Sequence, residues 1–160
     1  MGKLGRKWEP EENEEEGKKM LETSNIRDLF IVGQTILERL VDKVLIKKFG
    51  ISENSCDDAR FAMQFKMDIL SGSDLLVENL RSNIAAINHL RNMHAHRLEV
   101  EFNVIKVDID RLKYLGTMPE EDLGNNEIES GDERDEIPKI LLSKYRICVI
   151  QTFDELKKLL

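Results

Sequence analysis

Hydrophobic residues recur at helical spacing over most of the chain. The first long stretch runs from Ser24 to Phe49 and predicts an amphipathic helix, with Ser24 as the N-cap and Gly50 as the stop. Its apolar face consists of Ile26, Leu29, Phe30, Gly33, Ile36, Leu37, Leu40, Val41, Val44 and Leu45. This face is broader than a surface helix needs, so we expect it to lie in a bundle core or a dimer seam.

The same spacing predicts two more helices in the middle of the chain. One covers about 57–71, because Asp57 and Asp58 suit a first turn and Ser71-Gly72-Ser73 suits an end. Its expected inward positions are Phe61, Phe65, Ile69 and Leu70, and we expect Lys66 on its solvated face. The next runs from Asp74 to about Arg97, with the inward positions Leu75, Leu76, Leu80, Ile84, Ile87 and Leu90.

The pattern changes in the last third of the chain. Residues 99–104 alternate polar and apolar, so an extended segment and a lead-in to a helix over 104–115 both fit. Residues 116–136 have no periodicity and predict an acidic linker. A last helix over about 138–160 starts with Pro138 in its first turn. Its inward side carries Ile140, Leu141, Tyr145, Cys148, Val149, Thr152, Phe153 and Leu156.

These elements predict an all-α protein, an up-down bundle of about four or five helices. We expect a charged, flexible leader over residues 1–22 and one helical domain over residues 23–160 that includes the acidic linker at 116–136. A chain of 160 residues is long enough to bury one substantial core.

The charge is distributed unevenly along the chain. The net charge is −7; residues 1–22 carry −2 and residues 119–136 carry −8, which leaves +3 for the remainder. The acidity of the whole chain is therefore a weak argument against a polyanionic partner. Cys56 and Cys148 form no paired motif, and we expect reduced thiols. No signal peptide or membrane span is expected, so the sequence predicts a soluble, cytoplasmic protein.

The strongest concentration of chemistry is the segment His89-Leu90-Arg91-Asn92-Met93-His94-Ala95-His96, which holds all three histidines. Cleaving an RNA phosphodiester without a metal needs a base for the 2′-hydroxyl, positive charge at the phosphorane and a proton donor for the leaving oxygen. Histidine fits the first or third role and arginine fits the second. Asn92 suits fixing an imidazole tautomer or binding a phosphate oxygen.

Helix geometry limits how these side chains meet. In a regular helix Arg91 and His96 lie roughly 140° apart, whereas Asn92 and His96 lie only about 40° apart. Arg91 and His96 therefore reach one substrate only if the helix ends or bends there, or if a second copy brings its own motif opposite the first. A cleft in a homodimer is the natural solution.

The segment Arg91-Asn92-Met93-His94-Ala95-His96 resembles the signature of the HEPN superfamily, an arginine and a polar residue followed at an interval by a histidine. A similar form occurs in the mannitol operon repressor-like branch. That branch also has a "K-x-x-x-L" helix, which is similar to Phe65-Lys66-Met67-Asp68-Ile69-Leu70 in this chain. The resemblance covers roughly residues 25–115. It implies a helical bundle, often dimeric, with Arg91 holding the phosphate, Asn92 beside it and His96 as general base or acid.

The resemblance implies two kinds of function. The first is a metal-independent endoribonuclease with a composite site at a homodimer cleft, of the kind found in toxin–antitoxin and defence systems; RNA and an antitoxin would be its partners. The second is a non-catalytic regulator or a protein- or nucleotide-interaction module. A third alternative comes from the residues alone: the stripe at 26–45 could complete another chain's bundle.

The sequence favours neither a metal nor a cofactor. His89 and His96 share a helix face seven residues apart, but metal-binding histidines on one helix usually lie four apart. None of the nine glycines forms a phosphate loop or a dinucleotide fingerprint.

Arg91 and His96 also have a structural alternative. Charged side chains near a helix C-terminus stabilise the helix dipole, and both residues could serve this role instead of catalysis.

Overall fold

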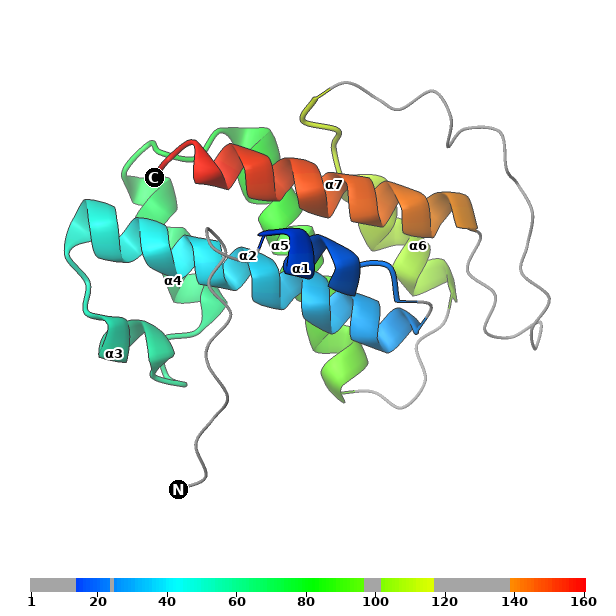
Figure 1. Cartoon of the computed structure of the whole chain (residues 1–160), viewed down its shortest axis with the longest axis horizontal. Coiled ribbons are helices and arrows are strands. Elements are labelled where there is room, and N and C mark those ends of the chain that lie inside the picture. Colours follow the sequence, from blue (N-terminus) through cyan, green and yellow to red (C-terminus); the bar gives the residue numbers. More distant parts are fainter. Residues whose placement is uncertain (1–13, 24, 97–101, 117–138) are drawn as a thin grey trace.

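The computed structural model describes residues 14–23, 25–96, 102–116 and 139–160 (Figure 1). Over these ranges the chain forms helices and no strand, so the all-α prediction is confirmed. The helices are α1 (Glu14–Met20), α2 (Ile26–Phe49), α3 (Glu53–Asp57), α4 (Met63–Gly72), α5 (Glu78–His96), α6 (Phe102–Arg111) and α7 (Lys139–Lys157). The five longest correspond to the predicted helices, and α1 and α3 are additional. Residues 102–104 belong to α6, so they are helical and not extended.

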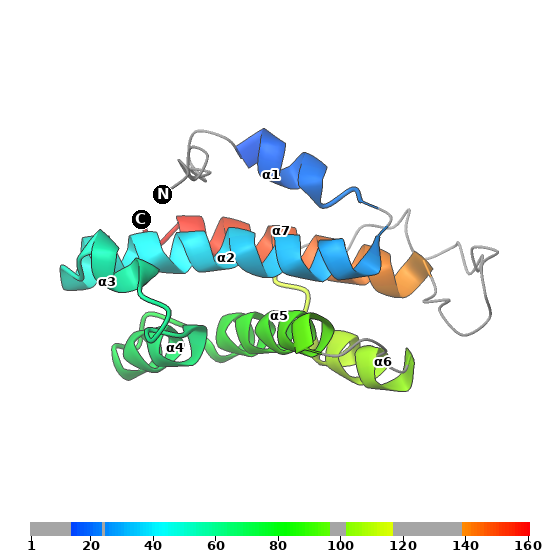
Figure 2. The same ribbon diagram turned by 90° about the horizontal axis from the view of Figure 1, so that it is seen from below.

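The helices pack in layers around α2. Figure 2 shows α2 and α7 side by side in the middle, α1 on one side of them, and α4, α5 and α6 on the other. α2 and α7 run in the same direction. Near the starts of α2 and α7, the Arg146 guanidinium donates to the carbonyl oxygen of Leu21 at 2.7 Å. Near the ends of the two helices, the Lys47 ammonium donates to the carbonyl oxygen of Leu160.

Helix α2 forms the centre of the core because its apolar face is buried as predicted. Every position predicted for that face is buried except Ile26, which is half-buried. The N-cap is Asn25 rather than Ser24: the Asn25 side chain accepts a hydrogen bond from the backbone N–H of Asp28 at 3.0 Å. The helix ends at Gly50 with φ of 66°, a left-handed conformation that glycine adopts without strain.

The prediction of a single helix over 57–71 was wrong in its boundaries and in its buried face. The chain forms the short α3, a loop, and then α4. The side of α4 that faces the core carries Met63, Lys66, Met67 and Leu70, whereas Phe65 is 58% exposed. The predicted face was therefore displaced by about one residue, because hydropathy alone assigns a lysine to solvent.

Lys66 is buried, not solvated, because two carboxylates of α2 receive its ammonium. Its Nζ lies 2.7 Å from Asp42 Oδ1 and 3.0 Å from Glu38 Oε1, and it donates to the Cys56 carbonyl oxygen at 3.0 Å. Burial by itself would lower the pKa of Lys66, but the hydrogen bonds with the two carboxylates outweigh it, and the pKa is raised. Lys66 therefore stays charged and fastens α4 to α2.

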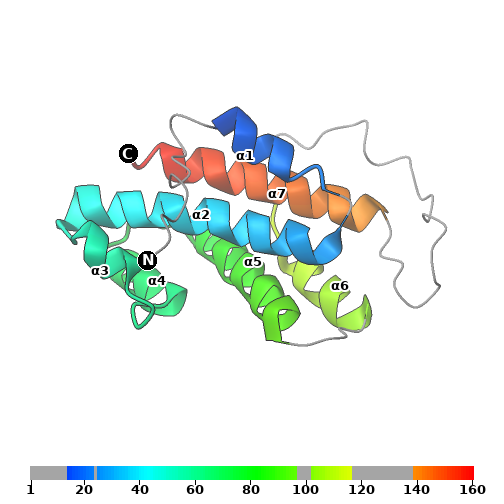
Figure 3. The same cartoon turned by 60° about the horizontal axis from the view of Figure 1, so that its bottom comes forward.

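Helix α5 crosses under α2 (Figure 3). It carries the segment from His89 to His96 that holds the three histidines. It begins at Glu78 instead of Asp74, whose φ of 58° interrupts the helical path. The fully buried Asn83 links α5 to the segment that follows α6: its side-chain NH2 donates to the Lys113 carbonyl oxygen at 2.8 Å, and its Oδ1 accepts from the Lys113 N–H at 2.7 Å. The predicted inward positions from Leu80 onward are buried.

Part of the segment predicted as a flexible leader is folded. α1 lies over α2 and α7, Gly17 and Leu21 are buried, and Lys157 donates to Glu14 at 2.5 Å. The charge-rich composition gave no sign of this helix, because the buried residues at its contact with the core are one glycine and the leucine that follows the helix. Residues 1–13 and most of the acidic linker (117–138) lie outside the described residues.

The two cysteines lie in the packed interior. Cys56 and Cys148 are both buried free thiols. Burial raises the pKa of Cys148 to about 11, so this thiol stays protonated at neutral pH.

No described helix combines the length and the apolar character needed to cross a bilayer.

Candidate functional site

Helix α5 has an inner face in the core and an outer face on the surface of the bundle. The outer face carries Arg81 and His89, both exposed, and Arg91 and Asn92 are half-buried at the border between the two faces. The motif therefore begins at a surface of the bundle rather than inside its core. The inner face is almost completely buried; it carries the polar Asn83 and the apolar residues Leu80, Ile84, Ala86, Ile87, Leu90 and Met93.

Arg91 and Asn92 contact each other directly. The Arg91 Nη1 donates to Asn92 Oδ1 at 2.9 Å, and the Nε of Arg91 is buried with no hydrogen-bond partner. Within the part of the chain that the structure describes, Arg91 forms no ion pair with a carboxylate. The guanidinium is therefore oriented by a neutral amide, and it keeps donors for an anion such as a phosphate.

His96 is the last residue of α5, and its side chain lies outside the described residues. The structure brings Arg91 and Asn92 together, but it does not test the predicted meeting of Arg91 with His96. The helix is continuous to residue 96, so the two positions keep the roughly 140° separation of a regular helix.

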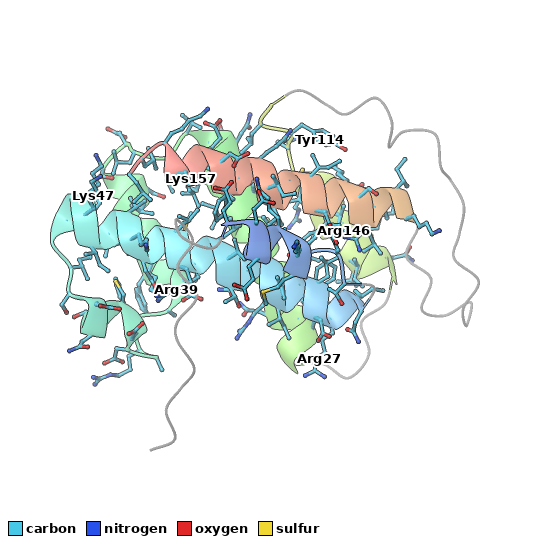
Figure 4. All side chains as sticks on the ribbon, in the orientation of Figure 1. Arg27, Arg39, Lys47, Tyr114, Arg146 and Lys157 are labelled. Atoms are coloured by element: carbon cyan, nitrogen blue, oxygen red, sulfur yellow. The ribbon has the colours of Figure 1, made fainter. Side chains whose placement is uncertain are left out.

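His94, which had no assigned role within the motif, packs against the core. Its ring lies edge-on to Phe30 with a centroid distance of 4.7 Å, and its Nε2 is buried without a partner. Burial, and secondly the positive charge of Arg27, lower the pKa of His94 below its ordinary value. Figure 4 shows Arg27 at the start of α2, near the end of α5. His94 is therefore neutral at pH 7.

The lowered pKa of His94 predicts a loss of stability in mild acid. In the unfolded chain His94 takes up a proton near its ordinary pKa of 6.5, whereas the folded protein takes it up only at lower pH. The unfolded state binds more protons between these two pKa values, so the free energy of unfolding falls as the pH drops below 6.5. We expect His94→Leu to make this fall shallower in urea titrations at several pH values. Identical pH dependence in both proteins would contradict the assignment.

His89 has a partner that the sequence did not suggest. Its Nδ1 lies 2.6 Å from Oδ2 of Asp108, a buried carboxylate on α6. The two residues are 19 positions apart, and no local spacing pattern links residues on different helices. The one sequence signal for this pair was the position of Asp108 among the apolar residues of α6, where an aspartate needs a polar partner.

The described residues hold no group of three or more histidine, cysteine or carboxylate side chains that could bind a metal ion. Four hollows of the described surface are lined by residues of α1, α2, α3, α4, α7 and the segments next to them.

Comparison with known proteins adds no relative. No family model, curated protein or solved structure matches the chain.

Proposed function

We propose that the C-terminal end of α5 is the RNA-cleaving surface of a metal-independent endoribonuclease of the HEPN type, which acts as a homodimer. Arg91 would bind the scissile phosphate, Asn92 would orient the guanidinium, and His96 would transfer the proton. The observation that carries this proposal is the Arg91–Asn92 pair, a cation held at a helix end by an amide 2.9 Å away.

The surroundings of Arg91 support a binding role over a purely structural one. Other described arginines use their donors within the fold: Arg60 pairs with the Asp58 carboxylate at 2.9 Å, and Arg146 donates to the carbonyl oxygens of Leu21 and Thr23. The described carboxylates leave Arg91 without such a pair. A phosphate would receive the remaining donors in a charge-assisted, bidentate geometry.

The chemistry proposed for the site is an internal transfer of the phosphodiester. The RNA 2′-hydroxyl loses its proton and its oxygen bonds to phosphorus, the bond from phosphorus to the 5′ oxygen breaks, and that oxygen gains a proton. The products are a 2′,3′-cyclic phosphate and a 5′-hydroxyl. Arg91 would stabilise the negative charge of the pentacoordinate transition state.

A homodimer follows from the helix register. The positions of Arg91 and His96 lie about 140° apart around the axis of α5, and a regular helix does not bring positions so far apart to one phosphate. A two-fold partner would supply the second motif across the groove. Light scattering of the purified protein should therefore give twice the mass of the 18.5 kDa chain.

The direct test is RNA cleavage by the purified protein in EDTA, which removes divalent metals. We expect the native protein to cleave RNA, and His96→Ala and Arg91→Ala each to lower the rate by about 100-fold or more. Arg81→Ala is the matched control because Arg81 is an exposed arginine on the same helix outside the motif. We expect it to cleave at the native rate.

Equal cleavage by all four proteins would point to a contaminating nuclease and overturn the proposal. RNA that stays intact with the native protein would also overturn it. RNA bound but intact would instead favour the non-catalytic regulator.

A further inference from the structure

Helix α4 has a second apolar face, which the described helices leave partly exposed. Phe61, Phe65 and Ile69 follow at intervals of four residues and therefore share one side of α4 and of the turn before it. Phe65 is 58% exposed, and the other two are half-buried. Met67 and Leu70, on another side of α4, are buried in the core. The apolar spacing of this segment therefore exceeds what packing onto α2 requires.

The three exposed or half-buried side chains border an open hollow of about 620 Å³ between α3 and α4. Ile51 and Ser55 line its opposite wall. A single exposed apolar side chain is ordinary on a protein surface, whereas a contiguous apolar surface with a polar rim is typical of an interaction site. We call the surface formed by Phe61, Phe65, Ile69 and this hollow the α4 face.

The rim of the α4 face carries charges of both signs, one at each end. Arg60 lies at the N-terminal end, where it pairs with Asp58 at 2.9 Å and remains 92% exposed. That pair uses Nε and Nη2 of the guanidinium, so Asp58 fixes Arg60 on the rim and leaves donors for a second carboxylate. Asp68 lies near the C-terminal end. It accepts from the Gln64 amide at 3.0 Å and forms no ion pair among the described residues.

A two-fold axis through Phe65 matches this surface to itself. Two antiparallel copies of α4 about that axis place Phe61 of each copy opposite Ile69 of the other, because both lie four residues from Phe65. The same pairing places Arg60 of each copy beside Asp68 of the other, and each Phe65 beside the hollow of the other copy. An interface between two-fold related copies has to be self-complementary. The α4 face meets this requirement in its apolar pattern and in its charges.

We propose that the α4 face is a two-fold interface with a second copy of this chain, with Phe65 at its centre and an Arg60–Asp68 pair at each edge. The interface uses α4 and not the C-terminal end of α5, so it is separate from the proposed RNA cleft and does not depend on it. A chain that uses both contacts forms a tetramer, a pair of dimers.

Phe65→Asp is the direct test, with the mass measured by light scattering over a dilution series. We expect association through the α4 face to weaken by at least about 100-fold, because two carboxylates would meet at the axis. The urea midpoint of dilute protein should stay nearly unchanged, since Phe65 is exposed. At high concentration the native protein should have twice the mass of Phe65→Asp, whether or not the α5 dimer also forms.

Val107→Asp is the matched control for the added charge. Val107 is 52% exposed on α6, and Figure 2 shows α4 and α6 at opposite ends of their layer. We expect Val107→Asp to have the mass of the native protein at each concentration. A loss of association in Phe65→Asp alone therefore reports on the α4 face.

Charge reversal tests the pairing across the axis. Arg60→Glu and Asp68→Arg should each weaken association by about 10-fold, because each replaces two attractive pairs with two repulsive ones. The two changes combined exchange the charges and restore both pairs, so this variant should associate within a few fold of the native protein. A different protein bound to the α4 face would not produce this recovery.

Two results would overturn the inference. The first is a native protein with the same mass as Phe65→Asp at every concentration. The second is a combined variant that associates no better than the single reversals. Neither result depends on RNA cleavage, so the proposed endoribonuclease is tested separately.

Discussion

Lys66→Met should lower the free energy of unfolding by about 3–5 kcal/mol, because it leaves the buried Asp42 carboxylate with only a weaker described partner, the Arg39 guanidinium 3.8 Å away. The Lys66 ammonium is 2.7 Å from Asp42, and both side chains are almost completely buried. Burial already raises the pKa of Asp42, and Lys66 partly offsets this effect. Removal of the ammonium would force Asp42 to remain charged in the core or to take up a proton.

Urea titration measures this effect, and a second substitution identifies its cause. Lys66→Met combined with Asp42→Asn should be more stable than Lys66→Met alone, since the stranded charge is gone. Arg60→Ala is the exposed control: Arg60 pairs with Asp58 but is 92% exposed, and its loss should leave the urea midpoint nearly unchanged. A midpoint for Lys66→Met equal to the native value would show that the buried network does not hold α4.

Gly33→Ala should lower the free energy of unfolding by about 1–3 kcal/mol, although alanine is the better helix former. A Cβ at Gly33 would overlap the hydroxyl oxygen of Tyr145 and lie 3.0 Å from its Cζ. The Tyr145 ring is fully buried and lies 4.8 Å from the Phe30 ring, so it has little room to move. This close approach sets the separation of α2 and α7.

Tyr145→Phe should reduce the destabilisation caused by Gly33→Ala. The Tyr145 hydroxyl is buried with no hydrogen-bond partner, so its removal should be neutral or stabilising. In the Tyr145→Phe background the cost of Gly33→Ala should shrink, because the nearest atom is absent. Gly72→Ala is the control, since no atom lies within 4 Å of its Cβ, and it should not destabilise the protein. An equal cost of Gly33→Ala in both backgrounds would contradict the packing argument.

Only the contacts between neighbouring residues of the candidate site could be predicted from the sequence. Arg91 and Asn92 are adjacent in sequence, and their contact follows from neighbouring positions on one helix. The partnership of His89 with Asp108 and the packing of His94 on Phe30 depend on how α5 meets α6 and α2. A sequence pattern has no information about such crossings.

The hydrophobic spacing was sufficient to predict the long helices and most of their buried faces, because apolar residues at every third or fourth position form one stripe on a helix. Gly50 predicted the end of α2 for a similarly local reason. The burial of Lys66, the folding of α1 onto the core and the pairing of His89 depend on how the helices pack. Each of these features joins groups that are far apart in the chain. Their charges pair and their apolar surfaces are buried only after the helices have packed.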